Sequence, residues 1–138
     1  MKISARVHNS RGKHQVELQT GDQTRSIVIL PRENGFGSSV NGAELLSLAL
    51  ATCYCNDIYR EAAKKGIQVT NVEVQVEGDA LAEGAPMTNV SYRAKVKAKA
   101  TVEEIQALMK YTDTVAEIQN TLRRLTPVTL GKIEAVNH

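Results

Sequence analysis

The sequence predicts one α+β domain over residues 1–138, and three features of the chain lead to this prediction. Apolar and polar residues alternate in the first thirty residues and again between residues 69 and 100, with the two-residue period of half-buried strands. A long apolar segment between these regions ends in two lysines and a glycine, which is typical of a helix end. Two helix starts after residue 100 complete an order of strands and helices that is typical of α+β proteins.

The composition is that of an ordinary globular protein, with 42% hydrophobic and 23% charged residues. A net charge of +2 gives no electrostatic reason to expect a nucleic acid or an anionic membrane as a partner, and we expect neither. The apolar stretch Leu45–Cys53 is about half the roughly 20 residues that a membrane helix needs, and residues 1–10 do not resemble a signal peptide. Two cysteines without a disulfide framework indicate a reducing compartment, so we expect a cytoplasmic protein.

The first part of the chain is expected to form three short strands. Apolar residues alternate from Ile3 to Val7, and the pattern resumes at Val16 after the turn "NSRGK". After a second turn at "GDQ", the segment "SIVIL" at residues 26–30 predicts a more buried strand. The glycine-rich loop at residues 31–42 then leads into the long helix.

That helix is predicted from about Gly42 to Lys65, with Gly66 closing it. Its first half is apolar nearly all round, which predicts burial on every side. Its second half regains a polar face through five residues: Asp57, Arg60, Glu61, Lys64 and Lys65. We therefore expect the first half to cross a core and the second half to emerge from it.

Two long strands are predicted next, "VTNVEVQVEG" at residues 69–78 and "NVSYRAKVKAKA" at residues 89–100. The polar positions of the first strand are partly acidic and those of the second are basic, as expected for an antiparallel pair with one solvated face. The lysines of the second strand are therefore interpreted as part of a solvated face rather than as a site for nucleic acid.

Two helices follow, and each is predicted to begin with a capping box. Thr101 with Glu104 forms the first box, and Thr114 with Glu117 forms the second. The segment "TPVTLGKIEAV" at residues 126–136 is predicted to close the chain as a strand.

Cys53 and Cys55 are the two cysteines of the chain, and they lie two residues apart on the predicted central helix. Side chains at this spacing project about 200° apart, so a disulfide between them is excluded without local unfolding. A zinc site is also not expected, because the three histidines show no ligand spacing. Cys53 continues the apolar half of the helix, and it could be a reactive thiol or a packed core residue.

The segment "NGAELLSLALATC" at residues 41–53 resembles the N-P-x-E-L-L-x-x-A-L-x-x-C signature of the OsmC/Ohr family of hydroperoxide-reducing thiol peroxidases. The predicted order of elements is similar to the βββαββααβ fold of that family over essentially the whole chain. The resemblance implies an intertwined homodimer with active sites at the subunit interface. A partner chain would then supply part of the burial that the apolar helix requires.

For individual residues, the resemblance implies that Cys53 is the peroxidatic thiol, which a hydroperoxide oxidises to a sulfenic acid. Arg11, in the first hairpin turn, stands where an arginine of the family stabilises the thiolate; the alternative is a solvated arginine. Glu44 stands nine residues before the cysteine, as the functional glutamate does in some branches, whereas another branch has it at Ala43. Glu44 can instead close a capping box with Asn41.

Peroxidases of the family also carry a later resolving cysteine, and that position corresponds here to Ala116 or Val115. The usual intramolecular disulfide therefore cannot form. One candidate function is that of a one-cysteine hydroperoxide reductase that uses an external thiol, with no metal or cofactor. Another is a non-catalytic module that binds a small apolar ligand at the dimer interface, and a third is a stress-associated interaction protein with an inert Cys53.

Overall fold

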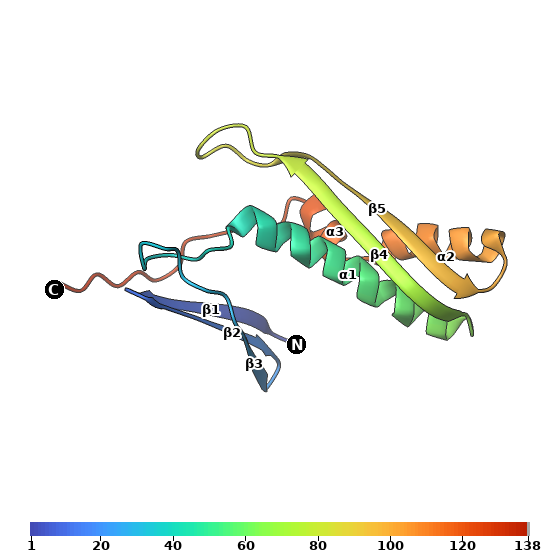
Figure 1. Cartoon of the computed structure of the whole chain (residues 1–138), viewed down its shortest axis with the longest axis horizontal. Helices are drawn as coiled ribbons and strands as arrows, with labels where there is room; N and C mark the ends of the chain where they lie inside the picture. Colours follow the sequence, from blue (N-terminus) through green and yellow to red (C-terminus); the bar gives the residue numbers. More distant parts are fainter. Residues whose placement is uncertain (138) are drawn as a thin grey trace. The chain divides into compact units, whose positions relative to one another are not determined.

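The computed structural model describes residues 1–137. It confirms the predicted α+β class and the order of its elements up to the last helix. These elements are β1 (Ile3–Ser10), β2 (Lys13–Thr20), β3 (Gln23–Ile27), α1 (Gly42–Lys64), β4 (Gln68–Asp79), β5 (Thr88–Lys99), α2 (Val102–Val115) and α3 (Glu117–Arg123) (Figure 1). The chain divides into two compact units, Met1–Leu46 and the part from Ser47 onward, which are described separately.

The first unit contains an antiparallel meander in the order β1-β2-β3. Val16 in the central strand pairs with Val7 on one side and with Ile27 on the other, and it is the buried residue of this sheet. The prediction of a more buried third strand at residues 26–30 is wrong. The strand ends at Ile27, and Val28 is 90% exposed, because β3 is an edge strand that pairs with β2 alone.

The loop after β3 is bonded to the β1–β2 hairpin within this unit. The backbone N–H of Gly12 donates to the carbonyl of Gly35 over 2.6 Å, and the Asn9 side chain exchanges hydrogen bonds with the backbone of Gly37. Gly35 has a φ of +87°, a conformation that L side chains rarely adopt, and a Cβ there would lie 3.2 Å from the Gly12 nitrogen. These contacts hold the hairpin turn that contains Arg11 against the loop that precedes α1.

α1 begins after a reciprocal pair of hydrogen bonds between Asn41 and Glu44, and it ends at Lys64, one residue earlier than predicted. Gly66 follows with a φ of +66°, as expected for a glycine that terminates a helix. The expectation that the first half is buried on every side is not met by this chain alone, since Leu48 is 58% exposed. α1 is instead buried along one stripe, whose members are Leu50, Tyr54, Asp57, Ile58, Glu61 and Ala62.

The second unit contains the main hydrophobic core of the described chain. α1 and α2 pack against one face of the antiparallel β4–β5 ribbon (Figure 1). The fully packed members of this core are Tyr54, Ile58, Ala62 and Leu108. On the opposite face of the ribbon Glu73 pairs with Lys95, and Arg93 donates to the Gln75 side chain over 2.6 Å. The predicted solvated face with opposed acidic and basic residues is therefore confirmed.

The two C-terminal helices confirm one predicted cap and contradict the other. Thr101 and Glu104 form the expected capping box at the start of α2. The second predicted box is wrong, because Ala116 rather than Thr114 precedes α3, and the Thr114 hydroxyl donates to the carbonyl of Tyr111. α2 therefore extends one residue past Thr114, and a buried alanine takes the N-cap position of α3.

The predicted closing strand is not formed. Residues 126–137 have no regular secondary structure, and Val128 and Val136 are 98% and 90% exposed. A strand needs a neighbouring strand for its backbone hydrogen bonds, and none of the five strands within residues 1–137 pairs with this segment.

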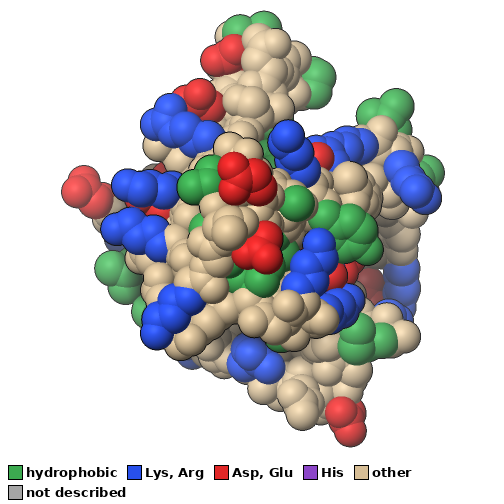
Figure 2. All heavy atoms as spheres, turned by 90° about the vertical axis from the view of Figure 1, so that its right-hand side faces the viewer, with side chains coloured by type: hydrophobic (Ala, Val, Ile, Leu, Met, Phe, Trp, Pro, Cys, Tyr) green, Lys and Arg blue, Asp and Glu red, His purple; other side chains and the backbone are tan. Residues whose placement is uncertain are grey.

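The surface agrees with the nearly neutral charge of the chain. Figure 2 shows basic and acidic side chains interspersed on one face, with hydrophobic side chains visible between them. Within the described part of the chain, every helix is too short or too polar to cross a lipid bilayer.

Candidate functional site

The two cysteines lie on different faces of α1, as their spacing predicts. Cys55 lines a shallow hollow together with Val74 of β4, whereas Cys53 faces Glu117 at the start of α3. Both thiols are free and half-buried. Cys53 is therefore the cysteine at the contact between α1 and α3, and Cys55 lies on the side of the ribbon.

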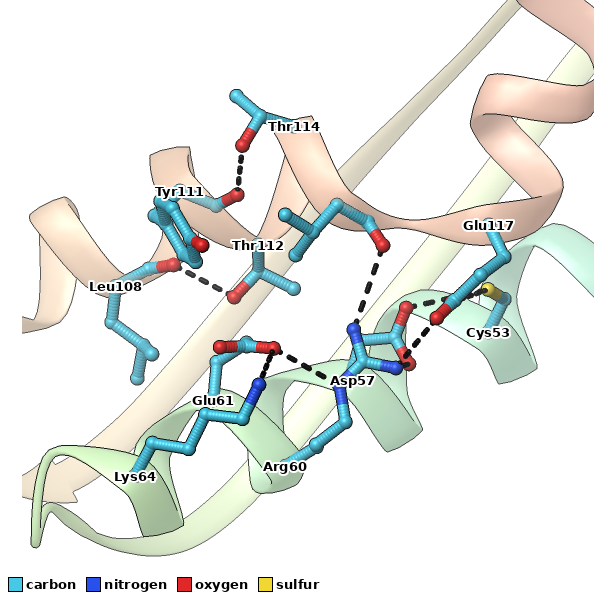
Figure 3. Close-up of polar contacts among 11 residues, drawn as sticks. Cys53, Asp57, Arg60, Glu61, Lys64, Leu108, Tyr111, Thr112, Thr114 and Glu117 are labelled. Carbon is cyan, nitrogen blue, oxygen red and sulfur yellow. Dashed lines mark hydrogen bonds and ion pairs between the residues drawn. The ribbon is translucent and has the colours of Figure 1, made fainter.

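Two carboxylates flank the Cys53 sulfur (Figure 3). The thiol donates to Oδ2 of Asp57, one helical turn later, over 3.5 Å, and Oε2 of Glu117 lies 3.6 Å from the same sulfur. The backbone N–H of Ile118, in the first turn of α3, also hydrogen-bonds to this sulfur. The thiol therefore has three polar neighbours, two carboxylates and one backbone N–H.

Arg60 connects the acidic residues of the site. Its Nη1 lies 3.0 Å from Oδ1 of Asp57 and 2.7 Å from Oε1 of Glu117, while its Nε donates to Oε1 of Glu61 over 3.0 Å. Lys64 reaches the same oxygen of Glu61 over 3.0 Å. One guanidinium group therefore neutralises charge on three carboxylates and ties α1 to α3.

The positions of these side chains follow from helix geometry. Residues 53, 57, 60, 61 and 64 fall on one stripe of α1, because residues three and four apart share a helix face. Glu117 arrives from a distant part of the sequence because α2 ends beside this stripe. The buried Ala116 and a hydrogen bond from Arg60 to the carbonyl of Val115 hold that junction in place.

Burial and charge shift the pKa values of this cluster in different directions. Burial, together with the negative charges of Asp57 and Glu117, raises the pKa of the Cys53 thiol, against the opposing effect of the Ile118 N–H. Burial, followed by a hydrogen bond with Glu117, raises the pKa of Asp57 to about 6. The pKa of Glu117 is lowered to about 2, first by its own backbone N–H and then by Asp57 and Arg60. Asp57 is therefore the carboxyl that titrates closest to neutral pH.

The same atoms could be considered as metal ligands, because the sulfur of Cys53 and carboxylate oxygens of Asp57 and Glu117 lie within 4.8 Å of one another. The guanidinium of Arg60 already bonds both carboxylates. A cation would have to displace it, so the donor set does not favour a metal ion. The arrangement instead places the Cys53 thiol beside the Asp57 carboxylate, which can accept its proton.

Comparison with known proteins identifies the family to which this fold belongs. The family described as OsmC-like protein matches residues 35–131, which is more than half of the chain. The chain belongs to the OsmC-like family. No curated protein matches this OsmC-like chain.

Solved structures support the same fold. An OsmC-like protein from Mycoplasma pneumoniae has a TM-score of 0.63 and 16% sequence identity, covering 89% of this chain and 88% of its own. An OsmC-like protein of unknown function from Vibrio cholerae has a TM-score of 0.63 and 18% identity, covering 88% and 93%. An organic hydroperoxide resistance protein from Legionella pneumophila has a TM-score of 0.53 and 22% identity, covering 89% and 90%.

The predicted site residues of this OsmC-like chain lie in different units. Glu44 forms the capping box with Asn41, through bonds of 2.8 and 3.0 Å, so its structural role is present at the start of α1. Arg11 lies in the β1–β2 turn of the first unit, whereas Cys53 belongs to the second. The roles of Cys53, Arg11 and Glu44 in catalysis stay predictions.

The sequence interpretation missed Asp57, Arg60 and Glu117 as site residues. The sequence pattern places Asp57 and Arg60 on the polar face of the second half of the helix and predicts Glu117 as a helix-capping residue. The i, i+4 spacing of Cys53 and Asp57 was a signal that could have linked them. For Glu117 the available signal was its place beside Ala116, which with Val115 is where the family resemblance implies a second cysteine.

Proposed function

We propose that this protein is a one-cysteine thiol peroxidase that reduces organic hydroperoxides through Cys53. The observation that supports this most is the Cys53 thiol itself, half-buried at the α1–α3 contact and donating to Asp57 within the Arg60 cluster. Its position at the end of the family signature and the fold shared with a hydroperoxide resistance protein support the same proposal.

In the proposed reaction, the sulfur of Cys53 attacks the terminal oxygen of the hydroperoxide. The S–O bond forms as the O–O bond breaks, so sulfur loses two electrons and the peroxide gains them. The products are an alcohol and a sulfenic acid on Cys53. An external thiol then displaces water to give a mixed disulfide, and a second thiol releases Cys53 as the free thiol.

External resolution is required because the chain offers no suitable second thiol. Cys55 lies on another face of α1, and Ala116 or Val115 stands at the position where the family resemblance implies the resolving cysteine. A reducing compartment such as the cytoplasm would keep both thiols free and supply the external thiol.

The proposal is tested by mass spectrometry of the reduced protein after brief exposure to cumene hydroperoxide in the presence of a sulfenic-acid trap. We expect one trapped adduct on Cys53 at near-stoichiometric peroxide. Cys55→Ser should retain this adduct and Cys53→Ser should lose it. Absence of the adduct in both the wild type and Cys55→Ser would refute the peroxidase proposal.

A second candidate function is a non-catalytic module that binds a small apolar ligand at a subunit interface. The raised pKa of Cys53 favours it, because a thiol that stays protonated at neutral pH is a poor nucleophile. An unreactive Cys53 in the trapping experiment, together with binding of an apolar fluorescent probe, would select this alternative.

We also propose that the protein forms a homodimer. The exposed apolar residues Ile3 and Val7 on β1 and Val128 and Ile133 after α3 support this, because a second chain could bury them. Sedimentation equilibrium should give the mass of two chains. A monomer at micromolar concentration would contradict the proposal.

A further inference from the structure

We propose that Asp57 accepts the proton of Cys53 as the sulfur attacks, and that Arg60 and Glu117 hold the Asp57 carboxylate in position for this transfer. The inference rests on the proposed peroxidase function and assigns the proton-transfer step of that same site. It is carried by the geometry of the contact between α1 and α3 (Figure 3).

The two oxygens of Asp57 have different partners. Oδ2 accepts from the Cys53 thiol over 3.5 Å, and Oδ1 lies 3.0 Å from Nη1 of Arg60. The same Nη1 is held by Glu117 at 2.7 Å. Because Arg60 is bonded from both sides, the carboxylate of Asp57 is oriented with one oxygen directed at the sulfur.

Glu117 is the competing proton acceptor, since its Oε2 lies 3.6 Å from the same sulfur. Its side chain is 59% exposed and its pKa is lowered to about 2, so it is a weak base that stays ionised. The Asp57 side chain is 7% exposed with a pKa raised to about 6. A base is most useful when its pKa lies near the working pH, and Asp57 meets this condition.

The charged and titratable groups that face Asp57 come from two helices. On α1 they are Cys53 and Arg60, and on α3 the facing group is Glu117. Arg60 lowers the pKa of Asp57, and Glu117 raises it. The positive and negative neighbours thus oppose each other, and the larger effect of burial leaves Asp57 able to bind a proton near neutral pH.

The proton balance of the step is simple. The S–H bond of Cys53 breaks as its proton moves to Oδ2 of Asp57, and the sulfur lone pair forms the S–O bond. The O–O bond breaks and leaves an alkoxide, which takes the proton from Asp57 to become the alcohol. Asp57 is then ionised again, and no other proton donor is needed.

The test measures the rate of sulfenic-acid formation with cumene hydroperoxide between pH 5 and pH 9. In the wild type the rate should fall as the pH drops below about 6, where Asp57 becomes protonated. Asp57→Asn should lose this pH limb and react about 100-fold more slowly at pH 7, the lower end of general-base contributions. Asp57→Glu should recover part of the rate, and Asp113→Asn, in an exposed cluster, is the matched control.

The variant also separates proton transfer from a purely electrostatic effect. Without the Asp57 charge the pKa of Cys53 should fall, so alkylation of Asp57→Asn by iodoacetamide at pH 7 should be faster than that of the wild type. Slower oxidation together with faster alkylation supports the proposal. Oxidation of Asp57→Asn at or above the wild-type rate overturns it, because Asp57 would then only suppress the thiol. If the wild type forms no sulfenic acid, the peroxidase function itself is refuted, and so is the role of Asp57 that depends on it.

Discussion

The second unit contains two clusters of carboxylates around an arginine, one centred on Arg60 and one on Arg123, and they differ in burial and in their contact with a cysteine. Arg60 binds carboxylates of which Asp57 and Glu61 are buried, and its cluster touches the Cys53 thiol. Arg123 binds Asp113 over 2.7 Å, and these two side chains are 49% and 41% exposed. Both clusters connect helices, but only the first contains a nucleophilic side chain.

The aspartates of the two clusters have pKa values shifted in opposite directions. Hydrogen bonds from Arg123 and Tyr92 lower the pKa of Asp113, although its partial burial acts in the opposite direction. Burial raises the pKa of Asp57 to about 6, although Arg60 acts in the opposite direction. An aspartate beside an arginine can therefore be shifted either way. Burial raises the pKa of both aspartates, and Glu117 adds to this effect at Asp57, whereas the hydrogen bonds from Arg123 and Tyr92 outweigh it at Asp113.

The largest expected effect comes from Arg60→Ala. It leaves the buried carboxylate of Asp57 without its arginine. Removing one partner of a fully buried pair costs about 3–5 kcal/mol, and because the Arg60 side chain is 38% exposed we expect about 2 kcal/mol here. Urea denaturation should show this loss in the free energy of unfolding. An unchanged urea midpoint would mean that water replaces the guanidinium without cost. The Arg60 and Arg123 clusters would then contribute equally little to stability.

The second effect concerns the pH dependence of stability. Asp57 binds its proton more tightly when folded, so its contribution to stability is present below about pH 4 and is lost as the pH rises through about 6. Asp57→Asn should remove this pH-dependent loss of unfolding free energy. We expect the loss to be roughly 1–2 kcal/mol, because the ion pair with Arg60 partly offsets the cost of burying the ionised carboxylate. Urea denaturation at pH 4 and pH 7 measures it, and parallel curves for variant and wild type would contradict it.

Glu117→Gln should change the thiol without large effects on folding. Loss of its negative charge should lower the pKa values of both Cys53 and Asp57, so alkylation and oxidation profiles should move to lower pH. The measurement is the rate of iodoacetamide labelling against pH. A profile that does not move would show that Glu117 is screened from the sulfur.

Arg123→Ala should have the smallest effect. Exposed ion pairs contribute about 1 kcal/mol or less, so the free energy of unfolding should fall by no more than this. The labelling profile of Cys53 should be the same as in the wild type. A change in that profile would mean that the two clusters are coupled through α2 and α3.

Much of the fold could be predicted because it depends on local patterns. The caps at Asn41 and Thr101 follow from residues three positions apart, and the β4–β5 ribbon follows from alternation. The predicted strand at 126–136 failed for the opposite reason, since its formation depends on a partner strand that local sequence does not supply.

Local sequence patterns were enough to predict the order of elements up to α3, the helix caps at Asn41 and Thr101, and the separation of the two cysteines on α1. These features depend on backbone geometry and near neighbours. Only the tertiary structure decided that Glu117 meets Cys53 across 64 residues and that Asp57 is buried. The physical reason is that desolvation, which raises the pKa of Asp57 and of the thiol, arises only when distant segments pack together and exclude water.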